Sequence, residues 1–247
     1  QVRYGLSLAI AGIPALPVEA VTLESPIPAP AQDVICLGIN YFDHAKESER
    51  VTGKGAKAPD TFPIYFSKRV TRAVPDGGPI EAHTDLVKKL DYECELAVVL
   101  GRDARDVPAG QTRDYIFGYT ILNDVSARDV QTAHKQWYFG KSLDGFTPIG
   151  PCIVTADAFA DYPPRLGIRS FVNGEKRQDS NTGLQIFDID HVIAELSQGM
   201  TLKAGTIIAT GTPAGVGMGM DPPQFLKPGD VVRCEIEGIG TLTNPVK

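Results

Sequence analysis

The chain has 247 residues, with 24 basic and 30 acidic side chains and a formal net charge of −6. This length allows one large domain or two small ones, with a buried hydrophobic core. The sequence shows neither a basic block nor an apolar run of roughly 18 residues, so we expect no nucleic acid partner and no membrane partner.

Short β-branched runs, separated by Gly and Pro, predict strands along most of the chain. In chain order, the expected strands cover residues 34–37, 91–100, 115–122, 152–154, 168–172, 206–210 and 231–236. An Asn-Gly pair at 173–174 predicts a hairpin turn. Helices are expected only at 126–135 and 190–198. The predicted fold class is therefore mostly β with few helices (α+β).

The distribution of prolines and charges predicts the domain organisation. Prolines at positions 26–30 separate a small N-terminal β segment, residues 1–30, from one large catalytic domain, residues 31–247. Residues 45–60 are charged, punctuated by Gly and poor in apolar side chains. Such a segment is typical of a lid over a site, and equally of an ordinary exposed loop.

Three carboxylates alternate at Asp91, Glu93 and Glu95, just before an apolar run. Alternate side chains of a strand share a face, so Glu93 and Glu95 would stand side by side. Two buried carboxylates need a proton or a cation between them, and hard divalent cations prefer oxygen ligands. Asp124, after the predicted strand 115–122, offers a third ligand. The alternatives are a solvated strand face for the glutamates and a helix N-cap for Asp124.

His44 and Glu47 form an H-x-x-E pair, which places both side chains on one side of a helical turn. A His–carboxylate pair can activate water, although an incidental surface pair has the same spacing. Residues 210–219 form a glycine-rich loop that lacks the Gly-Lys-Ser/Thr ending of a P-loop and the G-x-G-x-x-G spacing. Its backbone amides and the Thr212 hydroxyl could hold a small carboxylate, or the loop could simply be a turn.

Other polar residues carry little functional signal by themselves. Lys141 lies in a predicted loop, where a lysine is usually solvated, and the neighbours Arg128 and Asp129 are interpreted as a structural ion pair. The four cysteines are far apart, with no C-x-x-C pair. We expect reduced thiols in a cytoplasmic protein.

Taken together, several segments resemble the catalytic domain of the fumarylacetoacetate hydrolase family, from about residue 34 to the end of the chain. Residues 36–47, 91–96, 118–129, 140–148 and 201–217 carry the resemblance through their order and joint presence. The resemblance implies a mixed β-sandwich or roll and a homodimer. One departure is that Arg69 follows Lys68 where many relatives have proline. Arg69 or Arg72 could reach a second substrate carboxylate, but surface charge is the favoured interpretation.

The resemblance also implies the site residues. It assigns Mg²⁺ (or Mn²⁺) binding to Glu93, Glu95 and Asp124, catalysis to His44, Glu47 and Lys141, and substrate binding to Tyr41, Lys141, Thr212 and Arg128. The implied substrate is a small-molecule 2-oxo acid whose enolate the cation stabilises.

The reaction that follows stays open among three enzymatic alternatives. Acylpyruvate hydrolysis leads because the H-x-x-E pair is present. Oxaloacetate-type decarboxylation and 2-hydroxyhepta-2,4-diene-1,7-dioate isomerisation also fit that pair. A non-catalytic metal-binding relative and a calcium-stabilised structural domain are the alternatives from other classes.

Overall fold

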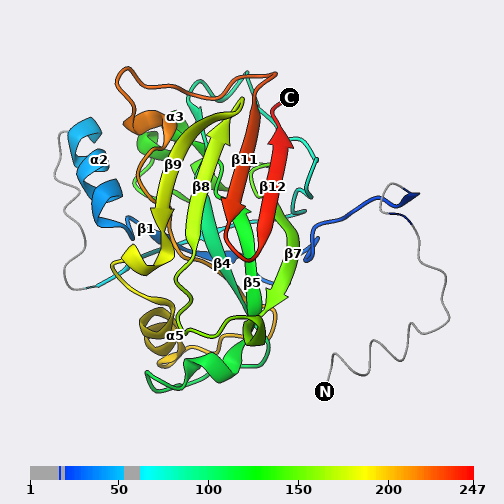
Figure 1. Ribbon diagram of the computed structural model, residues 1–247. Helices are drawn as coiled ribbons and strands as arrows, with labels where there is room; N and C mark the ends of the chain where they lie inside the picture. The colour runs from blue at the N-terminus through cyan, green and yellow to red at the C-terminus, as the bar shows by residue number, and fades with distance from the viewer. Residues whose placement is uncertain (1–16, 18–19, 53–61) are drawn as a thin grey trace.

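The computed structural model of the protein describes residues 17, 20–52 and 62–247 (Figure 1). Its larger sheet has six strands in the order β2 (Ile64–Lys68), β1 (Val34–Gly38), β10 (Ile207–Ala209), β4 (Cys94–Leu100), β5 (Ile116–Asn123) and β7 (Ile149–Thr155). Only the β1–β10 pair of this sheet is parallel.

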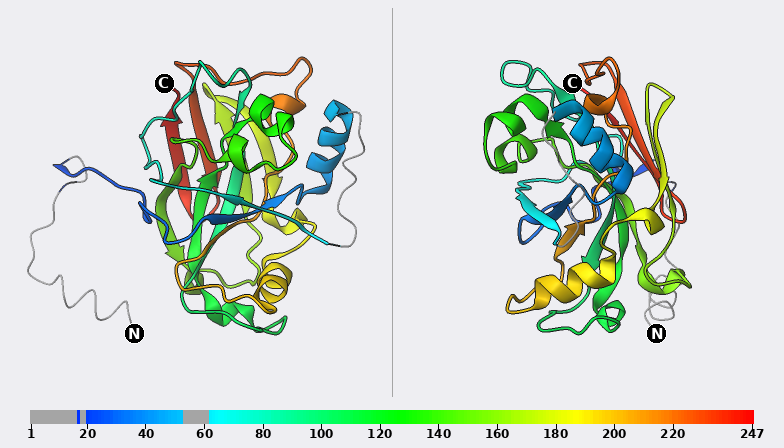
Figure 2. Two further views of the ribbon diagram at one scale, coloured as in Figure 1. Left: turned by 180° about the vertical axis from the view of Figure 1, so that it is seen from behind. Right: turned by 90° about the vertical axis from the view of Figure 1, so that its left-hand side faces the viewer.

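The second sheet has four antiparallel strands and lies in front of the first in Figure 1. Its order is β12 (Gly240–Pro245), β11 (Val231–Ile236), β8 (Gly167–Val172) and β9 (Glu175–Asn181). The view from behind in Figure 2 shows the larger sheet and its crossing β1 and β2 strands. A two-stranded pair, β3 (Leu90–Asp91) with β6 (Ser126–Ala127), completes the strands.

The strand β4 is buried on both faces, and this explains its nearly continuous apolar sequence. Leu96 and Val98 belong to the main core cluster, which also contains residues of β8 and β11. Ala97 and Val99 belong to a second cluster with residues of β1 and β10. Because side chains alternate along a strand, Glu95 lies on the same face as Ala97 and Val99.

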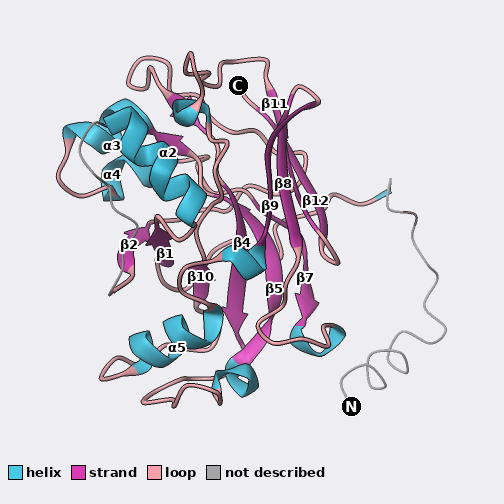
Figure 3. Cartoon of the chain, turned by 60° about the vertical axis from the view of Figure 1, so that its left-hand side comes forward, coloured by secondary structure: helices cyan, strands magenta, loops and turns pink. Residues whose placement is uncertain are grey.

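The helices are short and gather near the ends of the sheets (Figure 3). They are α2 (Phe42–Thr52), α3 (Arg128–Ala133), α4 (Tyr138–Lys141) and α5 (Ile189–Ser197). Single 3-10 turns lie at Thr112–Tyr115, Ala156–Ala158, Thr182–Leu184 and Gly217–Gly219. Among the described residues, no helix is long and apolar enough to cross a membrane.

The predicted fold class and core strands are confirmed, with some exceptions. The predicted run 91–100 is interrupted at Tyr92 and Glu93, and β2, β12, α2 and α4 were not expected. Residues 45–52 of the expected lid belong to α2, whereas 53–60 lie outside the described residues. Within the expected N-terminal β segment, residues 20–30 contain no strand; residues 1–16, 18 and 19 lie outside the description.

The core position of Leu96 gives a stability prediction. The side chain is fully buried in β4, so Leu96→Ala should lower the free energy of unfolding by about 2–5 kcal/mol. Urea denaturation followed by circular dichroism measures the change. Leu184→Ala is the matched control, because Leu184 is 59% exposed. An equal loss in both variants would contradict the assignment of the core.

Candidate metal and proton-transfer site

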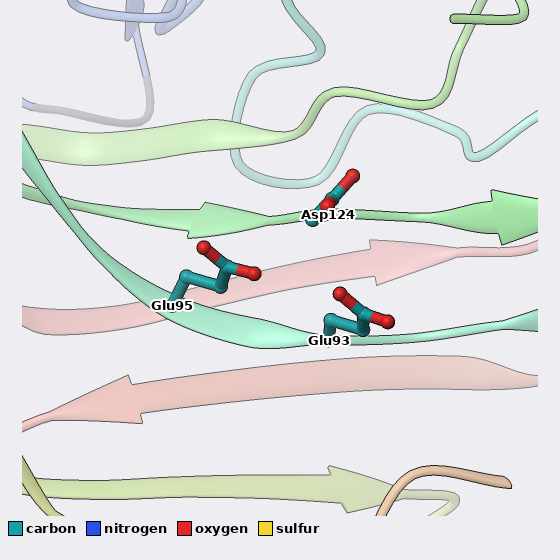
Figure 4. Close-up of side chains that lie close together, drawn as sticks. All are labelled: Glu93, Glu95 and Asp124. Atoms are coloured by element: carbon teal, nitrogen blue, oxygen red, sulfur yellow. The ribbon is translucent and has the colours of Figure 1, made fainter. Parts of the chain in front are cut away.

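Three carboxylates meet where β4 and β5 pair, at one end of both strands (Figure 4). Glu95 lies in β4, Glu93 immediately precedes it, and Asp124 immediately follows β5. One oxygen of each carboxylate lies within 4.8 Å of the others. The Asp124 N–H donates to the Glu93 carbonyl at 2.9 Å, so the backbone pairing extends beyond the strands and sets the position of two of the acids.

Asp124 is not a helix cap. Helix α3 begins at Arg128, its N-cap residue is Ala127, and no side chain caps it. The Asp124 carboxylate is instead fully buried between two lysines: Lys68 Nζ lies 2.7 Å from Oδ1 and Lys141 Nζ lies 2.7 Å from Oδ2. The cap interpretation of Asp124 is therefore wrong, and its role as a metal ligand stays a prediction.

Lys141 and Arg128 both contact Glu93. Lys141 Nζ lies 2.8 Å from Glu93 Oε2, and Arg128 Nη1 lies 2.6 Å from Oε1. Although burial raises the pKa of Glu93, these cations outweigh it and lower the pKa below its ordinary value. The expected pair between Arg128 and Asp129 is wrong, because Asp129 accepts a hydrogen bond from the Lys88 backbone N–H.

Glu95 is the acid that lacks a cationic partner among the described residues. Its Oε2 accepts a hydrogen bond of 2.7 Å from the Gly211 N–H. Burial, followed by repulsion from Asp124 and Glu93, raises its pKa well above the ordinary value. The buried cluster has four acids, Asp91, Glu93, Glu95 and Asp124, and three bases, Lys68, Arg128 and Lys141, so one negative charge is in excess when all of these groups are ionised.

This excess of charge fits a divalent cation. The donors at Glu93, Glu95 and Asp124 are all hard carboxylate oxygens, close enough to share one ion. A cation there would neutralise Glu95, the one carboxylate of the three without a cationic partner. These three residues therefore form a candidate site for Mg²⁺ or Mn²⁺.

His44 and Glu47 lie one turn apart on α2, and both are largely buried. Glu47 Oε2 lies 3.0 Å from His44 Nδ1, and Glu47 Oε1 accepts a hydrogen bond of 3.0 Å from the Gly215 N–H. The carboxylate can therefore orient the imidazole. The expected pairing of these two residues is present in the structure.

A cavity of about 130 Å³ joins the two groups. Its polar lining includes His44, Glu93, Arg128, Gln131, Lys141 and Thr212, and its apolar wall includes Phe66 and Trp137. Of the three metal-ligand candidates, Glu93 reaches this cavity. Tyr41 does not line it: that buried side chain borders a separate recess with Phe42 and Leu184.

The sequence did not indicate that Lys68 and Gln131 belong to the site, and it gave no role to Asp91. Lys68 is fully buried and donates to Asp124, to the Val125 carbonyl and to the Lys141 carbonyl. The apolar residues that precede it, 64–66, were the signal that this lysine ends a strand. Arg69 and Arg72, by contrast, are exposed and pair with Asp33 and Glu24, as surface charge.

The glycine-rich loop holds carboxylates of the protein itself. Its N–H groups at Gly211, Gly215, Gly217 and Met218 donate to Glu95, Glu47 and Asp91. The Thr212 hydroxyl donates to the Cys94 carbonyl and accepts from Gln178 Nε2. Because these four backbone amides already bind carboxylates of the protein, the expectation that they bind a small external carboxylate is wrong.

Comparisons with known proteins place this architecture in one enzyme family. The profile of the fumarylacetoacetate (FAA) hydrolase C-terminal family matches residues 33–247. The chain therefore belongs to this family, and the resemblance expected from its sequence is confirmed.

The names of individual relatives refer to different activities. The chain is 45% identical to "Oxaloacetate tautomerase YisK" of Bacillus subtilis (strain 168), over 92% of this chain and 73% of that protein. A fumarylacetoacetate hydrolase structure from Exiguobacterium antarcticum is 48% identical, with a TM-score of 0.79, covering 88% of this chain and 76% of that chain. A 2-hydroxyhepta-2,4-diene-1,7-dioate isomerase structure from Mycobacterium marinum is 40% identical, with a TM-score of 0.77, covering 95% and 81%.

The unequal charge environments of Glu93 and Glu95 predict opposite effects on stability. In the metal-free protein, Glu95→Gln should raise the free energy of unfolding by about 1 kcal/mol or more, because a carboxyl with a raised folded-state pKa destabilises the fold once ionised. Glu93→Gln should lower it by about 3–5 kcal/mol, because Lys141 and Arg128 lose their partner. Denaturant titration at neutral pH measures both.

Isothermal titration with Mn²⁺ should show loss of metal binding in both variants. The exposed acid Glu81 provides the control, since Glu81→Gln should change neither stability nor metal binding. A Glu95→Gln variant less stable than Glu93→Gln would contradict the charge distribution.

Metal binding should also release a proton. The metal binds the carboxylate form, whereas the raised pKa of Glu95 keeps a proton on the metal-free protein over a wider pH range. The apparent metal affinity should therefore rise with pH and level off above the folded-state pKa of Glu95. Calorimetry in two buffers of different ionisation enthalpy counts the released protons, and a pH-independent affinity without proton release would argue against this coupling.

Proposed function

We propose that the protein catalyses metal-dependent keto–enol chemistry of small 2-oxo acids, with tautomerisation of oxaloacetate as the leading reaction. The observation that carries the proposal is the cavity that borders both His44, which Glu47 contacts from behind, and Glu93 of the acidic cluster. Proton transfer and stabilisation of negative charge are the two requirements of enolisation, and both groups face the same small space.

Cationic side chains of the cavity support an anionic substrate. Arg128 is buried, and its Nη2 has no hydrogen-bond partner among the described residues, although Nε and Nη1 are engaged. A substrate carboxylate would satisfy that buried donor. Lys141 offers a second positive charge on the same wall. The small volume, well below the roughly 300 Å³ of drug-sized pockets, favours a short organic acid.

The His44–Glu47 pair is the proposed proton carrier. In conversion of the enol to the keto form, C3 of the substrate gains a proton while the enol oxygen loses one. His44 would accept the proton from the enol oxygen and deliver it to C3, with the reverse transfers in the opposite direction, and Glu47 would stabilise the imidazolium form between the two events. A divalent cation, when bound by Glu93, Glu95 and Asp124, would supply Lewis-acid stabilisation of the negative charge on the substrate.

The names of the relatives agree with proton movement as the leading reaction. One is called an oxaloacetate tautomerase and another an isomerase. We therefore rank tautomerisation above the acylpyruvate hydrolysis that the sequence favoured.

Hydrolysis remains the second candidate, because a His44 oriented by Glu47 can also activate water and a 48% identical structure is called a fumarylacetoacetate hydrolase. Decarboxylation of oxaloacetate would instead break the C3–C4 bond, release CO₂ and leave the enolate of pyruvate, which a cation at the same site would stabilise. A homodimer in the cytoplasm is also part of the proposal.

Product analysis separates these reactions. With Mg²⁺ present, we expect faster loss of the ultraviolet absorbance of enol-oxaloacetate, without release of pyruvate or CO₂, and loss of the effect in EDTA. Pyruvate and an organic acid from acetylpyruvate would identify a hydrolase, and pyruvate with CO₂ from oxaloacetate would identify a decarboxylase. No reaction with either substrate, while metal is bound, would overturn the proposal.

The proton-transfer role has its own variant. Glu47→Gln should lower kcat by about 10²- to 10⁴-fold, the range of a positioned general acid–base, without weakening metal binding. His191→Asn is the matched control, because His191 and Glu195 form an exposed His–Glu pair on α5. Equal effects of the two variants would remove the role assigned to Glu47.

A further inference from the structure

Asp91 is a fully buried carboxylate with no assigned function, although it lies beside the site. It is not among the residues that line the cavity. Its Oδ1 accepts hydrogen bonds from the Gly217 N–H at 2.7 Å and the Tyr92 N–H at 2.9 Å. Its Oδ2 accepts from the Met218 N–H and from Arg128 Nε, both at 2.9 Å. Asp91 therefore ties the glycine-rich loop to Arg128.

The same loop holds Glu47 in place. The Gly215 N–H donates to Glu47 Oε1, and the Arg50 guanidinium donates to the Gly219 carbonyl. Gly219 packs directly against the Glu47 carboxylate: a Cβ at this position would lie 2.0 Å from Glu47 Cδ. Helix α2 and the 3-10 turn at Gly217–Gly219 are in contact, as the right-hand view of Figure 2 also shows.

These contacts form one continuous chain from Asp91 to the proton-transfer pair. Asp91 anchors the amides of Gly217 and Met218, and the same loop contacts Glu47 on either side of them, through Gly215 and Gly219. Hydrogen bonds to a carboxylate are stronger than those between neutral groups. The Asp91 carboxylate therefore restricts the loop more than the backbone hydrogen bonds of an ordinary turn would. The carboxylate of Asp91 can thus influence Glu47 without touching it.

We propose that Asp91 is a positioning residue that holds the glycine-rich loop against α2 and thereby keeps Glu47 in the orientation needed for proton transfer. The proposal rests on the proposed function for the role of Glu47. It assigns a use to the glycines of the loop: they leave backbone amides free for protein carboxylates, and at Gly219 they leave room for Glu47.

Hydrogen exchange tests the structural half of this proposal without any substrate. Asp91→Asn keeps the size of the side chain but removes its charge and one of its accepting oxygens. In the Mg²⁺-bound protein, amide exchange of the peptide 211–220 should become at least about tenfold faster, because its anchor is weakened. Asp103→Asn is the matched control, since exposed Asp103 also accepts a backbone N–H, from Ala204. Unchanged exchange in Asp91→Asn would overturn the proposal.

A double-mutant cycle tests the coupling to Glu47. Asp91→Asn should lower kcat by about 10- to 100-fold in the wild-type background, and less than about threefold in the Glu47→Gln background. A purely structural role would give the same loss in both backgrounds, and an effect through Arg128 alone would raise KM and leave kcat unchanged. Either result would overturn the proposal. Should Glu47→Gln itself retain full activity, the assignment of Glu47 fails, and the exchange result still reports on the anchor.

Gly219→Ala provides a second variant that leaves Asp91 and Arg128 in place. Its Cβ would displace the Glu47 carboxylate, so kcat should fall by about tenfold or more while metal affinity is retained. Gly167→Ala is the control, because a Cβ there meets its neighbours only at ordinary contact distance, 3.4 Å or more. Wild-type kcat in Gly219→Ala would contradict the close packing on Glu47 that the proposal requires.

Discussion

The buried charge cluster at the ends of β4 and β5 is the constraint on which the rest of the site depends. Removing ions from water costs several kcal/mol per ion, and only close opposite charges offset that cost. Lys68, Arg128 and Lys141 meet this requirement for all the acids except Glu95. The strand pairing therefore creates a negative site that a divalent cation can neutralise, and among the described residues it leaves the buried Nη2 of Arg128 without a hydrogen-bond partner.

The arrangement separates two chemical tasks between two parts of the fold. The sheets carry the acids that would bind the cation, where both faces of β4 are packed and the backbone pairing is regular. Helix α2 carries the His44–Glu47 pair, and the glycine-rich loop connects α2 to the acidic cluster through backbone N–H groups. The loop contacts Glu47 through Gly215 and Glu95 through Gly211, so the two groups are held by different parts of the same loop. This separation suits a family whose members are named for different reactions.

Particular residues show where sequence reasoning succeeded and where it failed. Strand β4 was predictable because a strand buried on both faces is apolar nearly throughout, and the interruption by Glu95 marked the site. Helix α2 was missed because its sequence is charged and gives a weak apolar stripe. Arg128 was paired with its neighbour Asp129, whereas its partners are Asp91 and Glu93, 37 and 35 positions away. Adjacent charges in a sequence attract attention, but side chains at successive helical positions point apart.

The sequence by itself determined the strand pattern, the alternation that puts Glu93 and Glu95 near each other, and the one-turn spacing of His44 and Glu47, because each depends on local geometry that repeats every two or about 3.6 residues. Only the tertiary structure decided which cation meets which acid and which carboxylate each loop amide holds. Lys68 and Asp124 are 56 positions apart, and Gly217 and Asp91 are 126 apart. Such contacts follow from the packing of two sheets around a shared core, and no local rule reaches that far.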